Sequence, residues 1–398
     1  MNRATDPPMR AGLRPAADVR PGAEGVDASR TRGLEVLIIL PDLADGGAER
    51  LHVTLASLWH ARGAQVRFAL MRRRGEFLDL LPQGIEIDDL RVDRIRHAVL
   101  PLASLLRRRK PDIVLSAMWP LTTATVAAWM FAGRPGRLFL SDHSHLSTAC
   151  ADIGASPATV RRTMQWSYRF ADGVIAVSQE VKEDLCQLSG LVPSRIRVIH
   201  NPAATGGSPQ RADARERERL WGAGHAHHIL SVGKLKPQKD HATLIQAFAL
   251  LPESLGAKLT IVGDGPLRPE LERLAAASGA GARIAMPGFV RDPSPWYRSA
   301  DLFVLSSTSE GFGNVLVEAL ECGLPIVSTH CSGGPAEILE GGRFGRLVPP
   351  RDPAALAAAI AEALAAPCDR EALVARAQDF SADSIAAQYL AYFRERYG

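Results

Sequence analysis

Two glutamates, Glu310 and Glu318, flank the glycine-rich stretch 311–313, which follows an apolar run at 302–305. Glycine lets a backbone approach a ligand closely, and a helix beginning near Asn314 would aim free N–H groups and a positive dipole end at an anion. Because carboxylates repel phosphate, the glutamates are better suited to accept hydrogen bonds from hydroxyl groups. The stretch therefore predicts a site for a sugar and a ribose. An ordinary loop with a helix-start glutamate is the alternative.

Three lysines, Lys234, Lys236 and Lys239, lie in the loop after an expected strand at 228–232. Lysine binds phosphate as a point charge, and Asp240 is placed to cap the helix that follows. The chain has no pair of aspartates in the spacing D-x-D, which usually chelates the divalent cation on a nucleotide-sugar diphosphate. If the chain binds a diphosphate, side-chain cations and backbone N–H groups must therefore neutralise it. A solvated lysine loop is the alternative.

The first half of the chain carries two further candidate groups. Gly46 and Gly47 begin an expected helix and offer a second anion-accepting helix N-terminus. His143 and His145 follow the strand expected at 137–140, where a parallel sheet places functional groups. Either histidine could hydrogen-bond a substrate hydroxyl, and a structural role is the alternative for both.

The elements that must position these residues alternate between apolar strands and amphipathic helices, as in doubly wound α/β proteins. In the first half, strands are expected at 34–40, 66–71, 113–117, 137–140, 173–177 and 196–199. The alternation then restarts, with strands expected at 228–232, 258–262, 283–286, 302–305 and 325–328. Ligands of such sheets bind outside the carboxyl ends of the strands. We therefore expect an α/β fold of two Rossmann-like doubly wound domains that face each other across a cleft.

The chain is expected to divide into four parts. Residues 1–32 have little to bury and are expected to be a disordered tail. An N-terminal Rossmann-like domain at 33–202 and a C-terminal Rossmann-like domain at 203–380 follow, and a helix at 381–398 ends the chain. The charged stretch 211–219 is interpreted as part of the connection between the domains.

The composition, with 46% hydrophobic and 23% charged residues among 398, indicates an ordinary globular protein and excludes a coiled coil or a wholly disordered chain. The net charge of +4 is too small to argue for a nucleic-acid partner.

The uncharged run 113–133 is broken by Pro120 and fits a buried strand plus a helix better than a membrane span. Five cysteines without a C-x-x-C pair favour a reducing cytoplasm. Two basic runs, 72–74 and 107–110, suit either a solvated helix end or an anionic membrane surface.

Five motifs occur in an order that resembles the retaining glycosyltransferases of family four, of the bacterial cell-surface polysaccharide type. These motifs are Glu310 to Glu318 with its E-x7-E spacing, 231–240, 262–271, 287–289 and 323–327. The resemblance covers essentially everything after residue 32. It implies the GT-B fold, with a C-terminal helix that crosses back to the N-terminal domain. It also implies that the first domain binds the acceptor and the second binds the nucleotide-sugar donor.

The resemblance further implies roles for single residues: Glu310 contacts the donor sugar, Lys239 the diphosphate and Glu318 the ribose hydroxyls. Lys234 stands where the family usually has arginine, so it keeps the charge but lacks the bidentate fork. The expected catalytic residues are Glu310, Lys239, Lys234 and His143. The expected donor-binding residues are Gly233, Phe289, Arg291, Gly311, Phe312, Gly313, Asn314, Val315 and Glu318. The expected acceptor-side loop residues are Gly46, Gly47 and His145.

The implied activity is transfer of a sugar from a nucleotide-sugar, expected to be a UDP-sugar, to a saccharide or lipid-linked saccharide with retention of anomeric configuration. The process would be cell-surface polysaccharide or lipopolysaccharide biosynthesis. No metal, no other cofactor and no nucleic acid partner is expected. The basic first domain favours a cytoplasmic protein that is peripheral on the inner face of the cytoplasmic membrane. A nucleotide-sugar epimerase or hydrolase, or a non-catalytic nucleotide-sugar-binding protein of the same fold, is the alternative.

Overall fold

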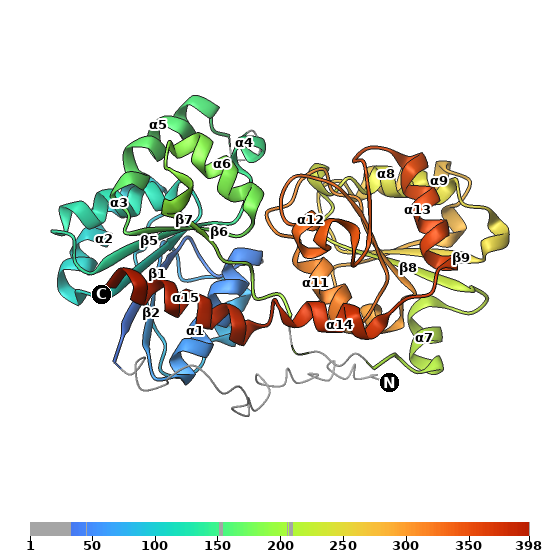
Figure 1. Cartoon of the computed structure of the whole chain (residues 1–398), viewed down its shortest axis with the longest axis horizontal. Coiled ribbons are helices and arrows are strands. Elements are labelled where there is room, and N and C mark those ends of the chain that lie inside the picture. The colour runs from blue at the N-terminus through green and yellow to red at the C-terminus, as the bar shows by residue number, and fades with distance from the viewer. Residues whose placement is uncertain (1–32, 45, 151–153, 205, 207–209, 398) are drawn as a thin grey trace, which may run out of the picture.

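Two α/β domains, each built on one parallel sheet, make up the computed structural model (Figure 1). This confirms the two Rossmann-like domains expected from the sequence. The expected disordered tail at 1–32 lies outside the described residues. The structure describes residues 33–397 except 45, 151–153, 205 and 207–209.

The first domain is centred on a seven-stranded parallel sheet in the order β3-β2-β1-β4-β5-β6-β7. Strand β4 is buried over its whole length, and β1 is buried except at its first residue, because helices cover both faces of the sheet. The strands are β1 (Glu35–Leu40), β2 (Gln65–Leu70), β3 (Glu86–Asp89), β4 (Ile113–Ala117), β5 (Arg137–Asp142), β6 (Gly173–Ala176) and β7 (Ile196–Val198).

Helices cover the two faces of this sheet unequally. Helix α1 (Gly47–Ala61) lies on one face and presents Leu51, Leu55 and Trp59, four residues apart, to the sheet. The opposite face carries α2 (Ile95–Arg109), α3 (Leu121–Phe131), α4 (Leu146–Ala149), α5 (Pro157–Ser167) and α6 (Gln179–Ser189). The uncharged run 113–133 forms β4 and α3, as expected. In the part of the chain that the structure describes, every helix is too short or too polar to span a membrane.

The second domain is centred on a six-stranded parallel sheet in the order β10-β9-β8-β11-β12-β13. Its strands are β8 (His227–Val232), β9 (Ala257–Val262), β10 (Ile284–Gly288), β11 (Leu302–Leu305), β12 (Ile326–Thr329) and β13 (Arg346–Val348). One face carries α8 (His241–Ala249), α9 (Arg268–Ala277) and α13 (Pro353–Ala365). The other core of this domain draws on α7 (Ala214–Trp221), α10 (Ser294–Ser299), α11 (Asn314–Glu321), α12 (Pro335–Ile338) and α14 (Arg370–Gln378).

The last helix, α15 (Ala382–Tyr397), leaves the second domain and packs against α1 of the first, as Figure 1 shows. The indole N–H of Trp59 donates to the carbonyl oxygen of Ala386 at 3.2 Å. The Trp59 ring also contacts Tyr389 and Phe393, with ring centroids 5.9 and 5.6 Å apart. The expected return of the C-terminal helix to the N-terminal domain is therefore confirmed.

The charged stretch 211–219 is not a connection, so the interpretation made from its composition is wrong. It forms most of α7, which begins after Asp213, whose carboxylate accepts a hydrogen bond from the N–H of Glu216 at 2.8 Å. The helix ends at Trp221, which is buried in the second domain and stacks on His228 with ring centroids 4.6 Å apart. Trp221, together with Leu220 and the contacts of Arg217 with His228 and Asp301, therefore fixes this helix to the second domain.

Candidate active site

Lys239 and Glu310 meet at the carboxyl ends of neighbouring strands β8 and β11. Lys239 ends the short helix η5 (Pro237–Lys239), and its Nζ atom donates to Oε1 of Glu310 at 2.5 Å. The hydroxyl of Ser307 donates to the same oxygen at 2.6 Å. Only 6% of Glu310 is exposed. The ammonium therefore compensates a nearly buried carboxylate, and both residues keep fixed positions.

Three hydrogen bonds to main-chain carbonyl oxygens hold the loops of these two residues together. The N–H of Thr308 donates to the carbonyl oxygen of Gln238 at 2.8 Å, and the Gln238 side chain donates to the carbonyl oxygen of Ser309 at 2.6 Å. The Ser306 hydroxyl donates to the carbonyl oxygen of Lys239 at 2.9 Å. These bonds hold the two loops together, so Lys239 and Glu310, which the sequence singled out in separate motifs, lie side by side.

Gly311 lies against the first domain. A Cβ atom at this position would overlap with the carbonyl oxygen of His143, which follows β5. The sequence predicted that glycine here admits a ligand; the structure shows that it admits the backbone of the other domain. The close approach brings the Glu310 loop and the His143 loop together across the interface.

Two helices begin at this interface without a side-chain cap. Gly46 precedes α1 and Gly313 precedes α11, and neither N-cap offers a side chain to the free N–H groups of its helix. A Cβ at Gly47 would lie 3.6 Å from Nδ2 of Asn314, so the two helix beginnings are adjacent. Asn201 donates to Oδ1 of Asn314 at 2.9 Å. Two helix beginnings therefore lie side by side. The Glu49 carboxylate lies against the start of α1, so the free N–H groups of α11 are the better candidates to meet an anion.

Glu318 lies one turn into α11, after Asn314. Burial raises its pKa, whereas the charge of Arg50 and the hydroxyl of Tyr297 oppose that shift. Arg50 belongs to α1, so a cation of the first domain acts on a carboxylate of the second. Sequence reasoning missed Arg50, although it lies in the first turn after the glycine pair that it did single out.

His143 is half-buried, and its Nε2 atom lies 3.0 Å from the hydroxyl of Ser141. Its ring contacts that of His52 edge-on, with ring centroids 5.3 Å apart. Burial, and to a lesser degree His52, lower the pKa of His143 well below its usual range, so the ring is neutral at pH 7. A neutral imidazole can donate or accept one hydrogen bond at each nitrogen but does not neutralise phosphate.

His145 is the N-cap residue of α4 and contacts neighbours within the first domain. The Thr148 hydroxyl lies 3.4 Å from its Nδ1 atom, and an Asp184 oxygen lies 3.8 Å from the same nitrogen. Among the described residues, the hydrogen-bond and ion-pair partners of His145 belong to the first domain. Of the two histidines proposed from the sequence, His143 is therefore the one at the interface.

Asp142, directly before His143, was missed by the sequence reasoning. Its carboxylate accepts a hydrogen bond from Tyr168 at 2.5 Å and another from the N–H of Trp119 at 3.2 Å, and the Tyr168 oxygen lies 3.0 Å from Thr122. Burial raises the pKa of Asp142 to about 6. The signal was present in the sequence, because an aspartate within an apolar strand must find partners when the strand is buried.

The remaining donor-side candidates lie on three adjacent loops of the second domain. The N–H of Gly233 donates to the carbonyl oxygen of Val262 at 2.9 Å, and that of Gly263 donates to the carbonyl oxygen of Gly288 at 2.9 Å. Phe289 follows β10 and is 65% exposed. The other candidates are placed as follows: Arg291 and Lys234 are exposed, Val315 is half-buried and Phe312 is buried.

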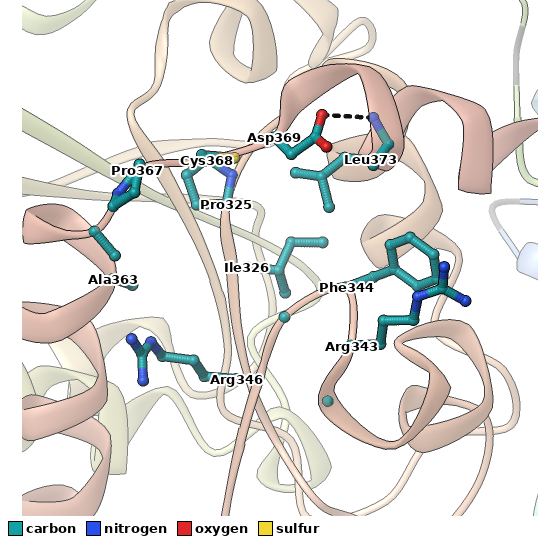
Figure 2. Close-up of a pocket in the computed structure, with 14 residues that line it drawn as sticks. Pro325, Ile326, Arg343, Phe344, Arg346, Ala363, Pro367, Cys368, Asp369 and Leu373 are labelled. Atoms are coloured by element: carbon teal, nitrogen blue, oxygen red, sulfur yellow. Dashed lines mark hydrogen bonds between the residues drawn. The ribbon is translucent and has the colours of Figure 1, made fainter.

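A cavity of about 550 Å³ lies elsewhere in the second domain, between the end of α13 and the start of α14 (Figure 2). Ile326 at the start of β12, Phe344, Arg346 and Leu373 are among its lining residues. It lies at the amino ends of the strands, opposite the edge that carries Lys239 and Glu310, and none of the sequence-predicted site residues lines it. Within the described ranges, no group of three or more His, Cys, Asp or Glu is placed to hold a metal ion.

Comparisons with known proteins identify the family of the chain. Residues 45–205 match the family described as Glycosyltransferase Family 4, and residues 226–366 match the family described as Glycosyl transferases group 1. The chain is 30% identical over 359 residues to the lipopolysaccharide core biosynthesis glycosyltransferase LpsE of Rhizobium meliloti, covering 87% of this chain and 95% of the relative. It is 32% identical over 183 residues to a Campylobacter jejuni N-acetylgalactosaminyltransferase named for a diphospho-undecaprenol substrate, covering 46% of this chain and 47% of the relative.

Solved structures share the fold. Anabaena HepE, in complex with UDP and glucose, superposes with a TM-score of 0.75 at 24% identity, covering 91% of this chain and 99% of HepE. WaaG, a glycosyltransferase involved in lipopolysaccharide biosynthesis, superposes with a TM-score of 0.64 at 20% identity, covering 88% and 95% of the two chains. With its two family matches and a relative aligned over nearly its whole length, the chain belongs to the family 4 glycosyltransferases with the GT-B fold.

Proposed function

We propose that this glycosyltransferase moves a sugar from a UDP-sugar to a saccharide or lipid-linked saccharide acceptor with retention of anomeric configuration. The observation that carries the proposal is the pair of Lys239 and Glu310, which lies beside two helix beginnings that lack side-chain caps. Such a site combines a fixed ammonium, a fixed carboxylate and free N–H groups. These groups suit the diphosphate and the hydroxyls of a nucleotide-sugar.

The UDP assignment rests on the structural neighbours. HepE has been solved in complexes with UDP, with UDP and glucose, and with UDP-glucose. In this chain, the exposed Phe289 and Arg291 lie on the loop after β10, where they could contact the nucleobase of the donor. Glu318 is proposed to accept hydrogen bonds from the ribose hydroxyls.

Leaving-group stabilisation is the main catalytic effect that we assign to the site. Breaking the bond between the anomeric carbon and the diphosphate develops negative charge on phosphate, and groups that are already oriented stabilise it without reorganisation. Lys239 has three N–H donors, of which Glu310 takes one. The others, together with Lys234 and the N–H groups from Phe312 to Val315, are proposed to bind the phosphate oxygens.

Retention is proposed to follow from attack on the same face of the sugar from which the diphosphate leaves. The acceptor oxygen forms the new bond to the anomeric carbon as the bond to the phosphate oxygen breaks, and that phosphate oxygen takes the acceptor proton. A double displacement would need a carboxylate nucleophile. Glu310 is poorly suited to that role, because one of its oxygens already accepts hydrogen bonds from Lys239 and Ser307.

We propose that no metal takes part. The side-chain cations and N–H groups described above are proposed to neutralise the diphosphate, in place of the divalent ion that a D-x-D pair would hold.

The proposed process is lipopolysaccharide or other cell-surface polysaccharide assembly on the inner face of the cytoplasmic membrane. The names of the Rhizobium and Campylobacter relatives support it. The surface of the first domain also supports this process. Helices α2, α3 and α5 lie together (Figure 1), and each has one large apolar side chain that is exposed. These are Leu100, Phe131 and Trp166, with 75%, 62% and 40% exposed. Exposed arginines on the same helices, Arg108 and Arg161 among them, suit anionic headgroups.

A donor panel with EDTA present tests the proposal. Nucleotide release is measured with and without saccharide and lipid-linked acceptors, and saturation-transfer NMR reports binding. We expect a UDP-sugar to bind without metal and to be consumed only when an acceptor is added. Full-rate consumption of donor alone would favour an epimerase or hydrolase, and binding without turnover a non-catalytic protein. Turnover that requires a divalent ion would contradict the metal-free part of the proposal.

A further inference from the structure

Two glutamates, one from each domain, bind main-chain N–H groups of the opposite domain. Glu180, in the first turn of α6, accepts a hydrogen bond from the N–H of Gly333 at 2.6 Å. Glu337, in α12, accepts one from the N–H of Gln179, the first residue of α6. The arrangement is reciprocal, because each carboxylate satisfies a backbone donor near the other carboxylate. Such charge-assisted bonds are about twice as strong as neutral ones.

The second oxygen of Glu337 also binds the first domain. Its Oε2 atom lies 3.0 Å from Nε2 of His200, in the segment that follows β7. The His200 ring stacks on Phe312 with centroids 5.2 Å apart and contacts Phe380 edge-on at 5.5 Å. Glu337 therefore joins α6 and the segment after β7 to the second domain at one point.

The segment that receives Glu180 supports the Glu310 loop. A Cβ atom at Gly333 would overlap with the carbonyl oxygen of Glu310, and the N–H of Glu310 donates to the carbonyl oxygen of Ser332 at 2.8 Å. Two contacts thus lead from Glu180 to the residue paired with Lys239. A change in how the domains dock would move the Glu310 loop relative to His143.

We propose that Glu180 and Glu337 are positioning residues that set the docking of the acceptor domain on the Glu310 loop. This inference rests on the proposed function, because it assigns the two domains to acceptor and donor. Neither glutamate needs to touch a substrate. Their carboxylates fix the relative position of the two domains, and the loss of either leaves a main-chain N–H at the interface without its acceptor.

Steady-state kinetics of the full chain tests the proposal. Glu180→Ala and Glu337→Ala are each expected to lower kcat/KM for the acceptor about tenfold, the loss expected for one charge-assisted hydrogen bond. Glu180→Gln and Glu337→Gln keep an acceptor oxygen and are expected to restore part of the rate. UDP affinity is expected to change less than about twofold, because a docking contact contributes no group to the donor. Glu183→Ala is the matched control, since Glu183 is exposed on α6 and bonds within its own helix.

The double variant and a scattering measurement complete the test. Both glutamates stabilise the same docked arrangement of the domains. The kcat/KM of the double alanine variant for the acceptor is therefore expected to be about that of the slower single variant. Small-angle X-ray scattering of the chain without ligands is expected to show a larger radius of gyration for the double variant. This readout needs no turnover, so it still decides the inference if no acceptor supports activity. Unchanged scattering, or a loss of UDP affinity equal to the loss of kcat/KM, would overturn the proposal.

Discussion

The ammonium of Lys239 and the carboxylate of Glu310 form a 2.5 Å hydrogen bond, although 71 positions separate the two residues in the chain. Each residue is therefore the structural partner of the other as well as a candidate for substrate contact. Removal of the ammonium leaves a nearly buried carboxylate without a counter-charge, and removal of the carboxylate leaves the ammonium without an anchor.

Lys239→Ala is predicted to lower kcat at least about 100-fold, the range seen when one preorganised donor to a developing negative charge is lost. Glu310→Gln keeps the shape of the side chain and the Ser307 contact but removes the negative charge. We therefore expect it to slow turnover and to leave the Lys239 ammonium less firmly held. The measurement is nucleotide release at saturating donor and acceptor. Lys182→Ala, a lysine change on α6, is the control.

Stability separates the two roles of the pair. Lys239→Ala is expected to lower the melting temperature more than the double variant Lys239→Ala with Glu310→Gln, because the double variant buries no unpaired charge. Equal melting temperatures for the single and double variants would show that Glu310 is solvated without Lys239. Full activity of Lys239→Ala would remove Lys239 from the proposed leaving-group site.

Gly311→Ala is predicted to reduce turnover through the domain interface. The added methyl would overlap with the carbonyl oxygen of His143, a backbone atom of the other domain. We expect acceptor kcat/KM to fall at least about tenfold, as for a small misplacement of reacting groups, while UDP still binds. Ala substitution of Ser144, which is exposed on the same loop of the first domain, is the control. Unchanged kinetics of Gly311→Ala would show that the domains need not approach this closely during turnover.

Asp142 is predicted to make stability depend on pH. Burial raises the pKa of its carboxyl from 3.8 to about 6, in spite of the opposing bond from Tyr168. The folded state therefore holds the proton more tightly than the unfolded state, and this contribution is lost as pH rises from about 4 to about 6. The free energy of unfolding of the wild type, relative to Asp142→Asn, should fall by about 3 kcal/mol across that window.

Urea unfolding of both proteins at a series of pH values measures this difference. Comparison with Asp142→Asn removes the contributions to stability that the two proteins share. If the free energies of unfolding of the two proteins differ by the same amount at every pH from 4 to 7, the pKa of Asp142 is not raised in the folded protein, and the prediction is wrong.

Much of the fold could be predicted because buried parallel strands such as 113–117 are continuous apolar runs. Edge strand β3 was missed, since Glu86, Asp88 and Asp89 make it polar, and Arg67 on β2 pairs with two of these carboxylates. Helix α14 was missed because its apolar residues follow no single helical face, and β13 because it has only three residues.

The residues of the site also fall into two groups, those marked by a local motif and those that depend on how the domains dock. Lys239 and Glu310 could be named as candidates because each lies in a local motif after a strand. The contacts of Asn201 with Asn314, and of Glu180 with Gly333, depend on how two domains dock. No local spacing encodes such a contact. The sequence singled out Gly311 for close approach to a ligand, and only the docked structure shows that the backbone at His143 lies against it.

Membrane binding through the first domain is the last prediction. Arg108 on α2 and both Arg161 and Arg162 on α5 are exposed, and each basic residue near an anionic surface contributes about 1 kcal/mol. The triple variant Arg108→Glu, Arg161→Glu, Arg162→Glu is therefore expected to bind vesicles with anionic lipid at least about 100-fold more weakly.

Binding of the wild type to these vesicles should also weaken as salt is raised, because surface charges are screened. Co-sedimentation measures both effects. Arg273→Glu, an exposed arginine on α9 of the second domain, is the control. Binding that responds neither to salt nor to the triple variant would show that this face does not meet the membrane through its charge.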